Sequence, residues 1–431
     1  MLLIYSHKIT NRLTYVTKQI FEGILGVDTT LTTRVEDFIK HAGPKITYTK
    51  QALQNEFFMR SNDLLFEQGI NDLDIRVSDW EGVPCFFATD EKSAIPYDIF
   101  SASFFLLSRY EEYLPHVKDS VGRYPAKESL AFRNKFLEIP VVDLWAYKLF
   151  RLLKVRFPDI QSKKRKYNFT SIVNVTASHC YAHRGLVRSL GGYLLDFGKL
   201  RFRRMVKRTT VLLGLSKDPY DNFEKLVQIH KRFKAKSMFF FQFAEYSAHD
   251  KNISPNNNKF RYLIKSIADY SVVSLSTSFL SSTDKTVLIE EKKGLGGLIH
   301  RPIKYARLRY NRVNVPNTYR TLIESEFTDD FSMGYTHQIG FRAGTCTPFH
   351  FYDISLESKQ PLKVHPFAIH DYALLDCKKP NEVFDKLDTI FRNTKEVKGS
   401  FVVIFSNELL GSKHRIPWIL LYENLLKRYH V

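Results

Sequence analysis

The stretch that decides the fold is FTSIVNVT, residues 169–176. Its aromatic and β-branched side chains predict a buried strand. Residues 220–233 then have apolar side chains near helical spacing, and the sequence MFFFQF at 238–243 predicts a second buried strand. A strand, a helix and a second strand in this order are typical of a parallel sheet or barrel.

The same alternation continues on both sides of this stretch. Residues 260–270 predict a helix, 272–275 and 401–405 predict strands, and 418–429 predict a closing helix. Upstream, the segment 95–107 is rich in aromatic and aliphatic residues, and 141–155 has helical spacing. A proline turn at Pro158 and the basic run 163–166 indicate a linker. We therefore predict an α/β protein with two domains, a mixed α/β domain at 1–160 and a (β/α) domain at 167–431.

The charge of the chain is unevenly distributed. Residues 1–160 hold 20 Lys and Arg against 21 Asp and Glu, whereas the remaining residues hold 44 against 24. The second part therefore carries nearly all of the net charge of +19. A field of this sign favours anionic partners such as an acidic glycan, an acidic lipid or a nucleic acid.

Cysteine spacing and hydropathy exclude several classes of protein. The cysteines Cys85, Cys180, Cys346 and Cys377 form no CxxC pair, so neither a structural zinc site nor a disulfide framework is predicted. No apolar run reaches the roughly 18–20 residues that span a bilayer. The start MLLIYSHK is apolar for only five residues, too few for a secretory signal. We expect a cytoplasmic protein, peripheral at the inner membrane face if it meets a membrane.

Seven short motifs resemble those of bacterial polysaccharide deacetylases with an additional N-terminal domain of unknown function. In chain order they are DWEG at 79–82, SRYEEY at 108–113, KES at 127–129, LGLSKDPYD at 213–221, DDFSMGY at 329–335, GFRAGTCTPF at 340–349 and HP at 365–366. The resemblance covers almost the whole chain. It implies an irregular (β/α) barrel for the second domain.

The resemblance also implies hydrolysis of N-acetyl groups on a surface glycan. Such deacetylases hold one divalent metal, typically zinc, with an Asp and two His side chains. A second Asp acts as general base on the metal-bound water, and a late His is the general acid. The metal lowers the pKa of the bound water and polarises the amide carbonyl.

This chain departs from the family pattern at the metal and catalytic positions. Asn174 and Thr176 stand where the family has Asp-x-Asp, and neither replaces a carboxylate as base or zinc ligand. Ser276 stands at a His ligand position, Arg309 aligns with a further His, and Ser406 replaces the expected acid. An Arg near the metal position would repel a dication. We therefore expect no cofactor and a catalytically impaired scaffold, a pseudoenzyme.

Several residues leave an active site open as an alternative. Arg342 matches an Arg that orients the base in the family, and here it is expected to hold an anion or stabilise the strand end. Asp329 and Asp330 are either an acid pair or a turn or helix cap. His179 and His183, four residues apart, could join these acids in a displaced zinc site.

Two further motifs are weaker. The sequence GLGG at 294–297 lacks the full spacing of a dinucleotide fingerprint, so we predict a flexible turn there. Ser276, Ser278 and Ser406 suggest a serine hydrolase, but no G-x-S-x-G elbow is present.

Two basic stretches could bind an anionic partner. Residues 184–208 hold eight Lys and Arg against Asp196, with leucines interleaved, as in an amphipathic helix on an anionic membrane. Residues 301–320 combine Lys and Arg with Tyr, which suits a single-stranded nucleic acid or an acidic sugar chain. The alternative for both is a solvated helix face whose basic side chains cover apolar surface.

Three functional hypotheses follow. The leading one is a deacetylase-like protein that binds or helps process an acidic cell-surface glycan or its lipid-linked precursor. The expected substrate-binding residues are Asn174, Ser276, Arg309 and Arg342. The second is an active zinc-dependent N-deacetylase with a rearranged site. The third is a basic module that binds nucleic acid or a membrane surface.

Overall fold

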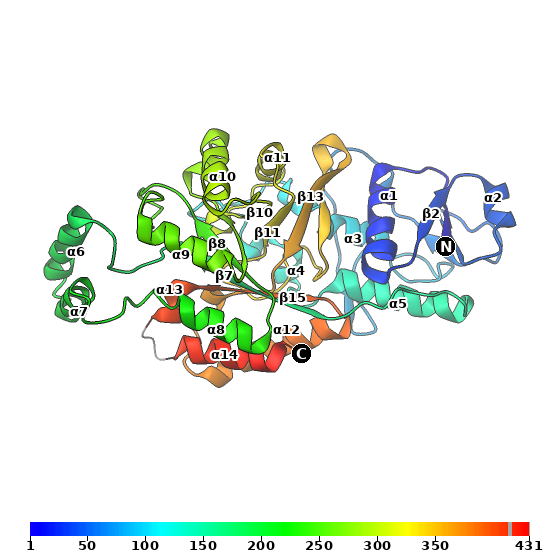
Figure 1. The fold of residues 1–431 in the computed structure, drawn as a ribbon. Helices are drawn as coiled ribbons and strands as arrows, with labels where there is room; N and C mark the ends of the chain where they lie inside the picture. Colours follow the sequence, from blue (N-terminus) through cyan, green and yellow to red (C-terminus); the bar gives the residue numbers. More distant parts are fainter. Residues whose placement is uncertain (413–415, 431) are drawn as a thin grey trace.

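The computed structural model describes residues 1–412 and 416–430, and its N-terminal part contains a small parallel sheet. The strand order is β2-β1-β3-β4, and every pair is parallel. Figure 1 shows helices α1 and α3 between this sheet and the rest of the chain, and α5 running below the sheet. The bounds are β1 Leu2–Tyr5, α1 Asn11–Lys18, β2 Thr29–Thr32, α2 Val35–Lys40, β3 Lys45–Thr49, β4 Phe58–Arg60, β5 Ser78–Trp80, β6 Val83–Cys85, α3 Ile99–Leu107, α4 Leu130–Arg133 and α5 Val141–Arg156.

The second part contains a nine-stranded sheet. Its order is β12-β13-β11-β10-β9-β8-β7-β15-β14, and all pairs are parallel except β12 with β13. The bounds are β7 Asn168–Val175, β8 Ser237–Gln242, β9 Val272–Ser276, β10 Tyr305–Arg307, β11 Asp329–Met333, β12 Phe349–Asp353, β13 Ser358–Pro366, β14 Ile369–His370 and β15 Ser400–Ser406. Strand order follows chain order from β7 to β11, so successive strand–helix units build the sheet.

The sheet curls into an incomplete barrel. Phe240 on β8 and Phe331 on β11 have ring centroids only 5.6 Å apart, although two strands separate β8 from β11. In a flat sheet these strands would lie about 14 Å apart. Ile172, Met238, Phe240, Phe331, Phe367, Val402 and Ile404 therefore form one apolar layer inside the curl. The predicted fold class, an α/β protein with an irregular barrel, is confirmed.

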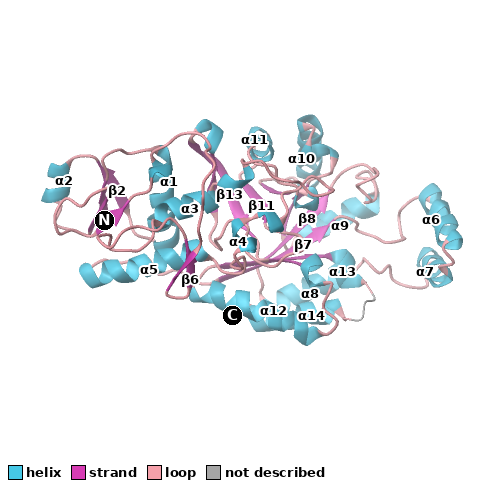
Figure 2. Ribbon diagram, turned by 180° about the vertical axis from the view of Figure 1, so that it is seen from behind, coloured by secondary structure: helices cyan, strands magenta, loops and turns pink. Residues whose placement is uncertain are grey.

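Helices connect and cover the barrel strands, and Figure 2 shows the same arrangement from behind. Two of them, α6 and α7, lie apart from the barrel in both views. The helix bounds are α6 Leu186–Gly198, α7 Phe202–Leu212, α8 Phe223–Phe233, α9 Asn258–Ala268, α10 Lys285–Ile299, α11 Asn317–Glu324, α12 Pro380–Glu396, α13 Asn407–Gly411 and α14 Trp418–Tyr429. None of the helices in the described part of the chain is both long and apolar enough to cross a bilayer.

The strands predicted at 169–176, 238–243, 272–275 and 401–405 are confirmed to within two residues, and so is the closing helix at 418–429. The turn predicted at 294–297 is wrong, because these residues lie inside α10. A Cβ on Gly294 would come within 2.9 Å of the Phe243 ring. Glycine there lets the helix pack closely on the end of β8, which offsets its poor helix propensity.

The N-terminal part packs directly against the barrel. The ring of Tyr15 on α1 lies 5.0 Å from that of Tyr352 on β12, and Phe104 on α3 lies 5.1 Å from the same ring. Asp143 on α5 accepts hydrogen bonds from the Thr345 hydroxyl (2.6 Å) and the Cys346 amide (3.0 Å). Residues 157–167, between α5 and β7, form neither helix nor strand.

Candidate functional site

Polar side chains meet inside the barrel where the parallel strands end. Ser406 lies beside Asn174 in register, and Gln242 lies beside Ser276, which lies beside Arg307. Asn174, Gln242 and Ser406 each lie two positions after a residue of the apolar layer. Alternate residues of a strand face the same side, so these three side chains also face the inside of the barrel, nearer its carboxyl end. We call these five residues the barrel mouth.

Arg307 is the charged member of the barrel mouth. Its side chain is buried, its Nη1 donates to the Phe331 carbonyl at 2.8 Å, and its guanidinium lies 5.3 Å from the centroid of the Phe367 ring. Its Nε has no hydrogen-bond partner among the described residues. Burial lowers the pKa of Arg307 to about 10, so the side chain stays cationic at neutral pH.

Two amide groups of the barrel mouth are incompletely satisfied. The Asn174 Oδ1 and Gln242 Oε1 atoms are buried without a hydrogen-bond partner in the described part of the chain. Gln242 uses its Nε2 to donate to Asp250. Buried polar atoms usually have partners, so unsatisfied ones in the same group of residues as a buried cation mark a polar site rather than a core.

Arg309 lies beyond the barrel mouth, in the turn that follows β10. Its Nη2 donates to the His249 carbonyl at 2.9 Å, and its Nε lies 3.4 Å from Asp250 Oδ1. The guanidinium covers the ring of Tyr310 at 4.4 Å. Arg309 therefore ties the β8–β9 connection to this turn, and Arg307 is the arginine that faces into the barrel.

Acidic groups border the barrel mouth on the β7 and β15 side. Thr176 donates to Glu408 Oε1 at 2.6 Å, and burial raises the pKa of Glu408 against the opposing effects of that hydrogen bond and of nearby arginines. Asp371 accepts from the Ser406 hydroxyl at 2.6 Å and lies 2.7 Å from His370 Nδ1. Because Ser406 donates to a carboxylate and not to an imidazole, it lacks the base of a serine hydrolase.

The residues at the barrel mouth do not fit a zinc ion. Asn174, Ser276 and Ser406, and Thr176 two residues after Asn174, offer only neutral oxygens, whereas zinc sites use Cys, His and carboxylates. Arg307 adds a buried positive charge beside them. Within residues 1–412 and 416–430, no three His, Cys, Asp or Glu side chains are grouped so that they could hold a metal.

His179 and His183 lie after β7, with ring centroids 5.0 Å apart. Burial lowers the pKa of His179, whose Nδ1 lies 3.2 Å from the Ser178 hydroxyl. The two imidazoles therefore lie close to each other. The acids that were predicted to complete a zinc site with them, Asp329 and Asp330, have other hydrogen-bond partners.

Asp329 and Asp330 begin β11 and face opposite sides of the sheet, so they form neither a turn nor an acid pair. Asp329 Oδ1 lies 2.6 Å from His365 Nε2. Asp330 is buried on the outer side and accepts from the Tyr319 hydroxyl at 3.1 Å and the Ser332 amide at 3.0 Å. Burial raises the pKa of Asp330, whereas hydrogen bonds from His365 and Thr328 outweigh burial and lower that of Asp329.

Arg342 lies at the contact between the N-terminal part and the barrel. Its Nε and Nη2 donate to the two carboxylate oxygens of Glu112 at 2.8 and 2.5 Å. Arg109 donates to the same carboxylate at 2.7 Å and also to the Arg342 carbonyl. All three side chains are buried. Arg342 therefore joins the two parts of the chain through an ion network.

Arg342 also lines a cavity of about 250 Å³ between the segment 119–132 and loops at the carboxyl ends of β10 and β11. Its lining includes Lys127, Asn311, Tyr335 and His337. We call this the Arg342 cavity. The Tyr335 hydroxyl and Asn311 Oδ1 are buried there without a hydrogen-bond partner among the described residues.

The Arg342 cavity adjoins the barrel mouth through aromatic contacts. The ring of His337 lies 6.1 Å from that of Tyr372, and Tyr372 lies 5.4 Å from His370, whose backbone pairs with β15. Arg123 holds the N-terminal wall in place, because its Nη1 donates to the Tyr310 carbonyl at 3.0 Å and the Thr336 hydroxyl at 2.9 Å. Two walls from distant parts of the sequence thus enclose one polar space.

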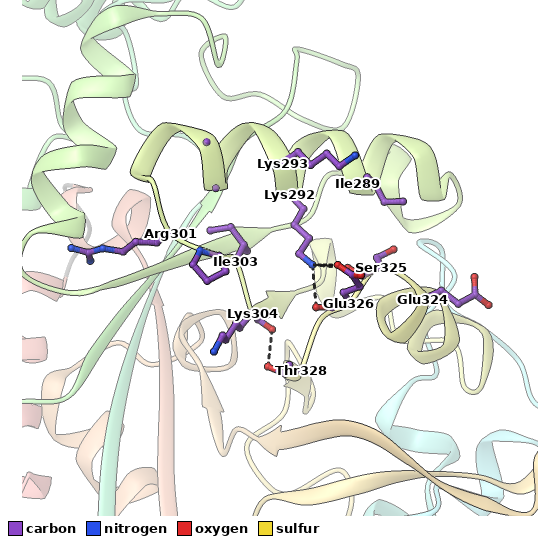
Figure 3. Close-up of a pocket in the computed structure, with 13 residues that line it drawn as sticks. Ile289, Lys292, Lys293, Arg301, Ile303, Lys304, Glu324, Ser325, Glu326 and Thr328 are labelled. Carbon is purple, nitrogen blue, oxygen red and sulfur yellow. Dashed lines mark hydrogen bonds and ion pairs between the residues drawn. The ribbon is translucent and has the colours of Figure 1, made fainter.

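A second cavity, of about 670 Å³, lies toward the amino ends of β10 and β11 (Figure 3). Lys292 reaches across from α10 and donates to the carbonyls of Ser325 at 2.7 Å and Glu326 at 3.0 Å. Lys293 and Lys304 also line it. Although larger, this Lys292 cavity lies away from the strand ends where barrels of this kind position their functional side chains.

Sequence pattern alone did not single out Arg307, Tyr335 or Glu408. Arg307 was counted only within the basic stretch 301–320, Tyr335 only within the motif at 329–335, and Glu408 lies outside the seven motifs. The feature that could have indicated two of them is their place at the end of a strand. Arg307 is the last residue of β10, and Glu408 is the second residue after β15.

Comparisons with known proteins match separate parts of the chain. Residues 2–158 match a family of unknown function, DUF7033. No curated protein sequence matches significantly. A putative polysaccharide deacetylase from Mycobacterium smegmatis is structurally similar over 62% of this chain and 86% of its own, with a TM-score of 0.39 and 15% identity.

Two further solved structures are similar over about the same share of this chain. The Puue allantoinase is similar over 60% of this chain and 83% of its own, with a TM-score of 0.38 and 10% identity. A mutant CE4 family pseudoenzyme with restored enzymatic activity is similar over 61% of this chain and 63% of its own, with a TM-score of 0.29 and 6% identity.

Proposed function

We propose that this protein binds an acidic glycan, or its lipid-linked precursor, in the Arg342 cavity, without metal-dependent deacetylation. The observation that carries the proposal is the pair of unsatisfied polar groups in that cavity, the Tyr335 hydroxyl and Asn311 Oδ1. A sugar offers hydroxyl groups that both donate and accept, which are the two roles that partners of these atoms require.

The charges around the cavity favour an acidic sugar over a neutral one. Lys127 is exposed at the cavity and has no ion-pair partner in the described part of the chain. Arg123 forms an ion pair with Asp119, and Arg342 forms one with Glu112, so the positive charges of both arginines are partly compensated. Lys127 is therefore the cation available to a uronic or otherwise acidic sugar.

Chemistry at the neighbouring barrel mouth supports binding without zinc. Its neutral oxygens and the Arg307 guanidinium suit hydrogen bonds to hydroxyl, carbonyl and carboxylate oxygens, and they do not suit a dication. The resemblance of the sequence motifs to polysaccharide deacetylases supports a glycan as the class of ligand. Both features fit a scaffold that recognises a glycan and no longer cleaves it.

The test is calorimetric titration of the full chain with tetragalacturonate, and with chitotetraose as the neutral N-acetylated control. Tyr335→Phe removes only the unsatisfied hydroxyl and is expected to weaken tetragalacturonate binding about ten-fold. Lys127→Gln is expected to weaken it about three- to five-fold. Lys293→Gln, an exposed lysine of the Lys292 cavity, is the charge-matched control and should leave affinity unchanged.

Three outcomes would overturn the proposal. The first is no binding of the acidic oligosaccharide, and the second is equal affinities for Lys127→Gln and Lys293→Gln. The third is release of acetate from chitotetraose with about one zinc per chain by elemental analysis, which would establish the rearranged deacetylase instead.

A further inference from the structure

Helices α6 and α7 form a hairpin that stands apart from the barrel (Figures 1 and 2). The chain enters it after β7 and leaves it before α8. The hairpin therefore lies between the first barrel strand and its connecting helix, and it is attached at the carboxyl end of β7.

The two helices contact each other through polar groups. Arg208 on α7 donates to Asp196 on α6 at 2.7 Å, and the Tyr193 hydroxyl lies 2.6 Å from the Thr209 hydroxyl. The Arg208 guanidinium also covers the Tyr193 ring at 5.3 Å. A helix pair in water normally buries its apolar stripe at this contact and exposes the polar one.

The apolar side chains of the hairpin point outward instead. Their exposed fractions are 83% for Leu186, 85% for Val187, 64% for Leu190, 74% for Leu194, 66% for Leu195, 60% for Phe197, 73% for Leu200, 54% for Phe202 and 64% for Val206. So many exposed apolar side chains on one hairpin mark a surface that binds a partner or a membrane.

The charge of the hairpin decides among the possible partners. Residues 184–208 hold eight Lys and Arg, and the single acid, Asp196, is already paired with Arg208. Lys199, Arg201, Arg203 and Arg204 are exposed around the turn between the helices. Two copies of so basic a hairpin would repel each other. A nucleic acid would match the charge but offers no apolar phase for the leucines.

We propose that the α6–α7 hairpin lies on the surface of an anionic bilayer. Its Leu, Val and Phe side chains enter the boundary of the acyl chains, and its Lys and Arg side chains contact lipid phosphates. The proposal uses no residue of the Arg342 cavity and does not depend on the glycan that binds there.

Hydrogen bonds join the two chain segments at the base of the hairpin to each other, and Arg188 joins the hairpin to the barrel. Asp218 accepts hydrogen bonds from the amides of Cys180 (2.8 Å), Tyr181 (2.8 Å) and Ala182 (2.9 Å). Arg188 donates to the Asn252 carbonyl at 2.9 Å. These contacts keep the hairpin attached beside the carboxyl end of β7, so a docked protein brings this end, and with it the barrel mouth, toward the bilayer.

The test is co-sedimentation of the full chain with vesicles. The wild type is expected to bind vesicles of mixed phosphatidylglycerol and phosphatidylcholine and not vesicles of phosphatidylcholine alone. The double variant Arg201→Gln/Arg203→Gln is expected to bind anionic vesicles about 30-fold more weakly, since each basic residue near the surface contributes separately. Leu186→Gln/Leu194→Gln is expected to weaken binding about ten-fold or more.

Leu420→Gln is the matched control, because Leu420 is 50% exposed on α14, away from the hairpin. All substituted side chains are exposed, so circular dichroism should show an unchanged fold. Equal binding to neutral and anionic vesicles, or no binding to either, would refute the proposal. So would a dimer of the wild type that Leu186→Gln/Leu194→Gln converts to monomer, because a second copy would then cover the apolar face.

Discussion

Two buried arginines in this molecule have opposite surroundings. At the contact between the two parts of the chain, Arg342 shares the carboxylate of Glu112 with Arg109. In the barrel mouth, Arg307 has one carbonyl partner and an unsatisfied Nε. Burial lowers the pKa of both, but ion pairing outweighs burial for Arg342, so its pKa is raised, whereas that of Arg307 is lowered.

The difference between the two arginines distinguishes a buried charge that stabilises the fold from one that does not. A buried ion pair with both partners present stabilises the native arrangement, and its disruption leaves an uncompensated charge. A buried charge without a carboxylate partner costs stability and persists at sites where a ligand or a reaction needs it. The Arg342 network therefore holds together the two parts of the chain that enclose the Arg342 cavity, whereas Arg307 lies in the barrel mouth without a carboxylate partner.

The largest effect is expected from Glu112→Gln. This change removes the carboxylate that two buried guanidinium groups share, so we expect the free energy of unfolding to fall by about 3–5 kcal/mol. Urea denaturation followed by circular dichroism measures it. Glu36→Gln, at an exposed position of α2, is the control. A loss below about 1 kcal/mol would mean that the network adds little to stability.

An intermediate effect is expected from Glu291, a buried carboxylate on α10 without a cationic partner in the described residues. Its Oε2 accepts from the Ser278 amide at 3.2 Å, and burial raises its pKa to about 7. Folding therefore favours the protonated acid. The resulting stability is present below the unfolded pKa of about 4.3 and is lost as the pH rises through about 7.

Glu291→Gln keeps a neutral side chain at every pH and removes this dependence. At about pH 8 the variant should be more stable than the wild type by up to about 3 kcal/mol, and at about pH 4 the two should be equal. Urea denaturation at both values tests this, with the exposed neighbour Glu290 changed to Gln as control. A difference that is the same at both pH values would rule out titration of Glu291.

The smallest effect on stability is expected from Arg307→Gln. Loss of a hydrogen bond to the Phe331 carbonyl is offset by removal of a desolvated charge, so the free energy of unfolding should change by about 1 kcal/mol or less. Arg342→Gln, measured beside it, should cost several times as much. If the two variants were equally destabilised, the contrast between the two arginines would be lost.

Local sequence patterns predicted the strands and helices of the barrel well. Segments such as 169–176 and 401–405 are rich in aromatic and β-branched side chains, which favour a strand without help from distant residues. The turn predicted at 294–297 failed because the reason for Gly294 is a distant neighbour, the Phe243 ring. Local propensity does not include such contacts.

The candidate site depended on contacts over much longer separations. Arg342 is bound by a carboxylate 230 residues earlier in the chain, and the Arg342 cavity combines residues 119–132 with the loops after β10 and β11. Contacts between residues so far apart in the chain leave no periodic pattern in the sequence. The sequence could therefore name Arg342 as a candidate but could not name Glu112 as its partner, nor Tyr335 and Lys127 as its neighbours in a cavity.

The sequence by itself determined the alternation of strands and helices, the positive charge of the second part, and the presence of neutral polar side chains at Asn174, Thr176, Ser276 and Ser406. These are properties of residue types and of their local spacing. Only the tertiary structure decided which charges are paired, which polar atoms lack partners, and that the leucines between residues 186 and 200 face outward. Those properties arise from curling and packing, which bring distant residues within hydrogen-bonding distance or leave them exposed.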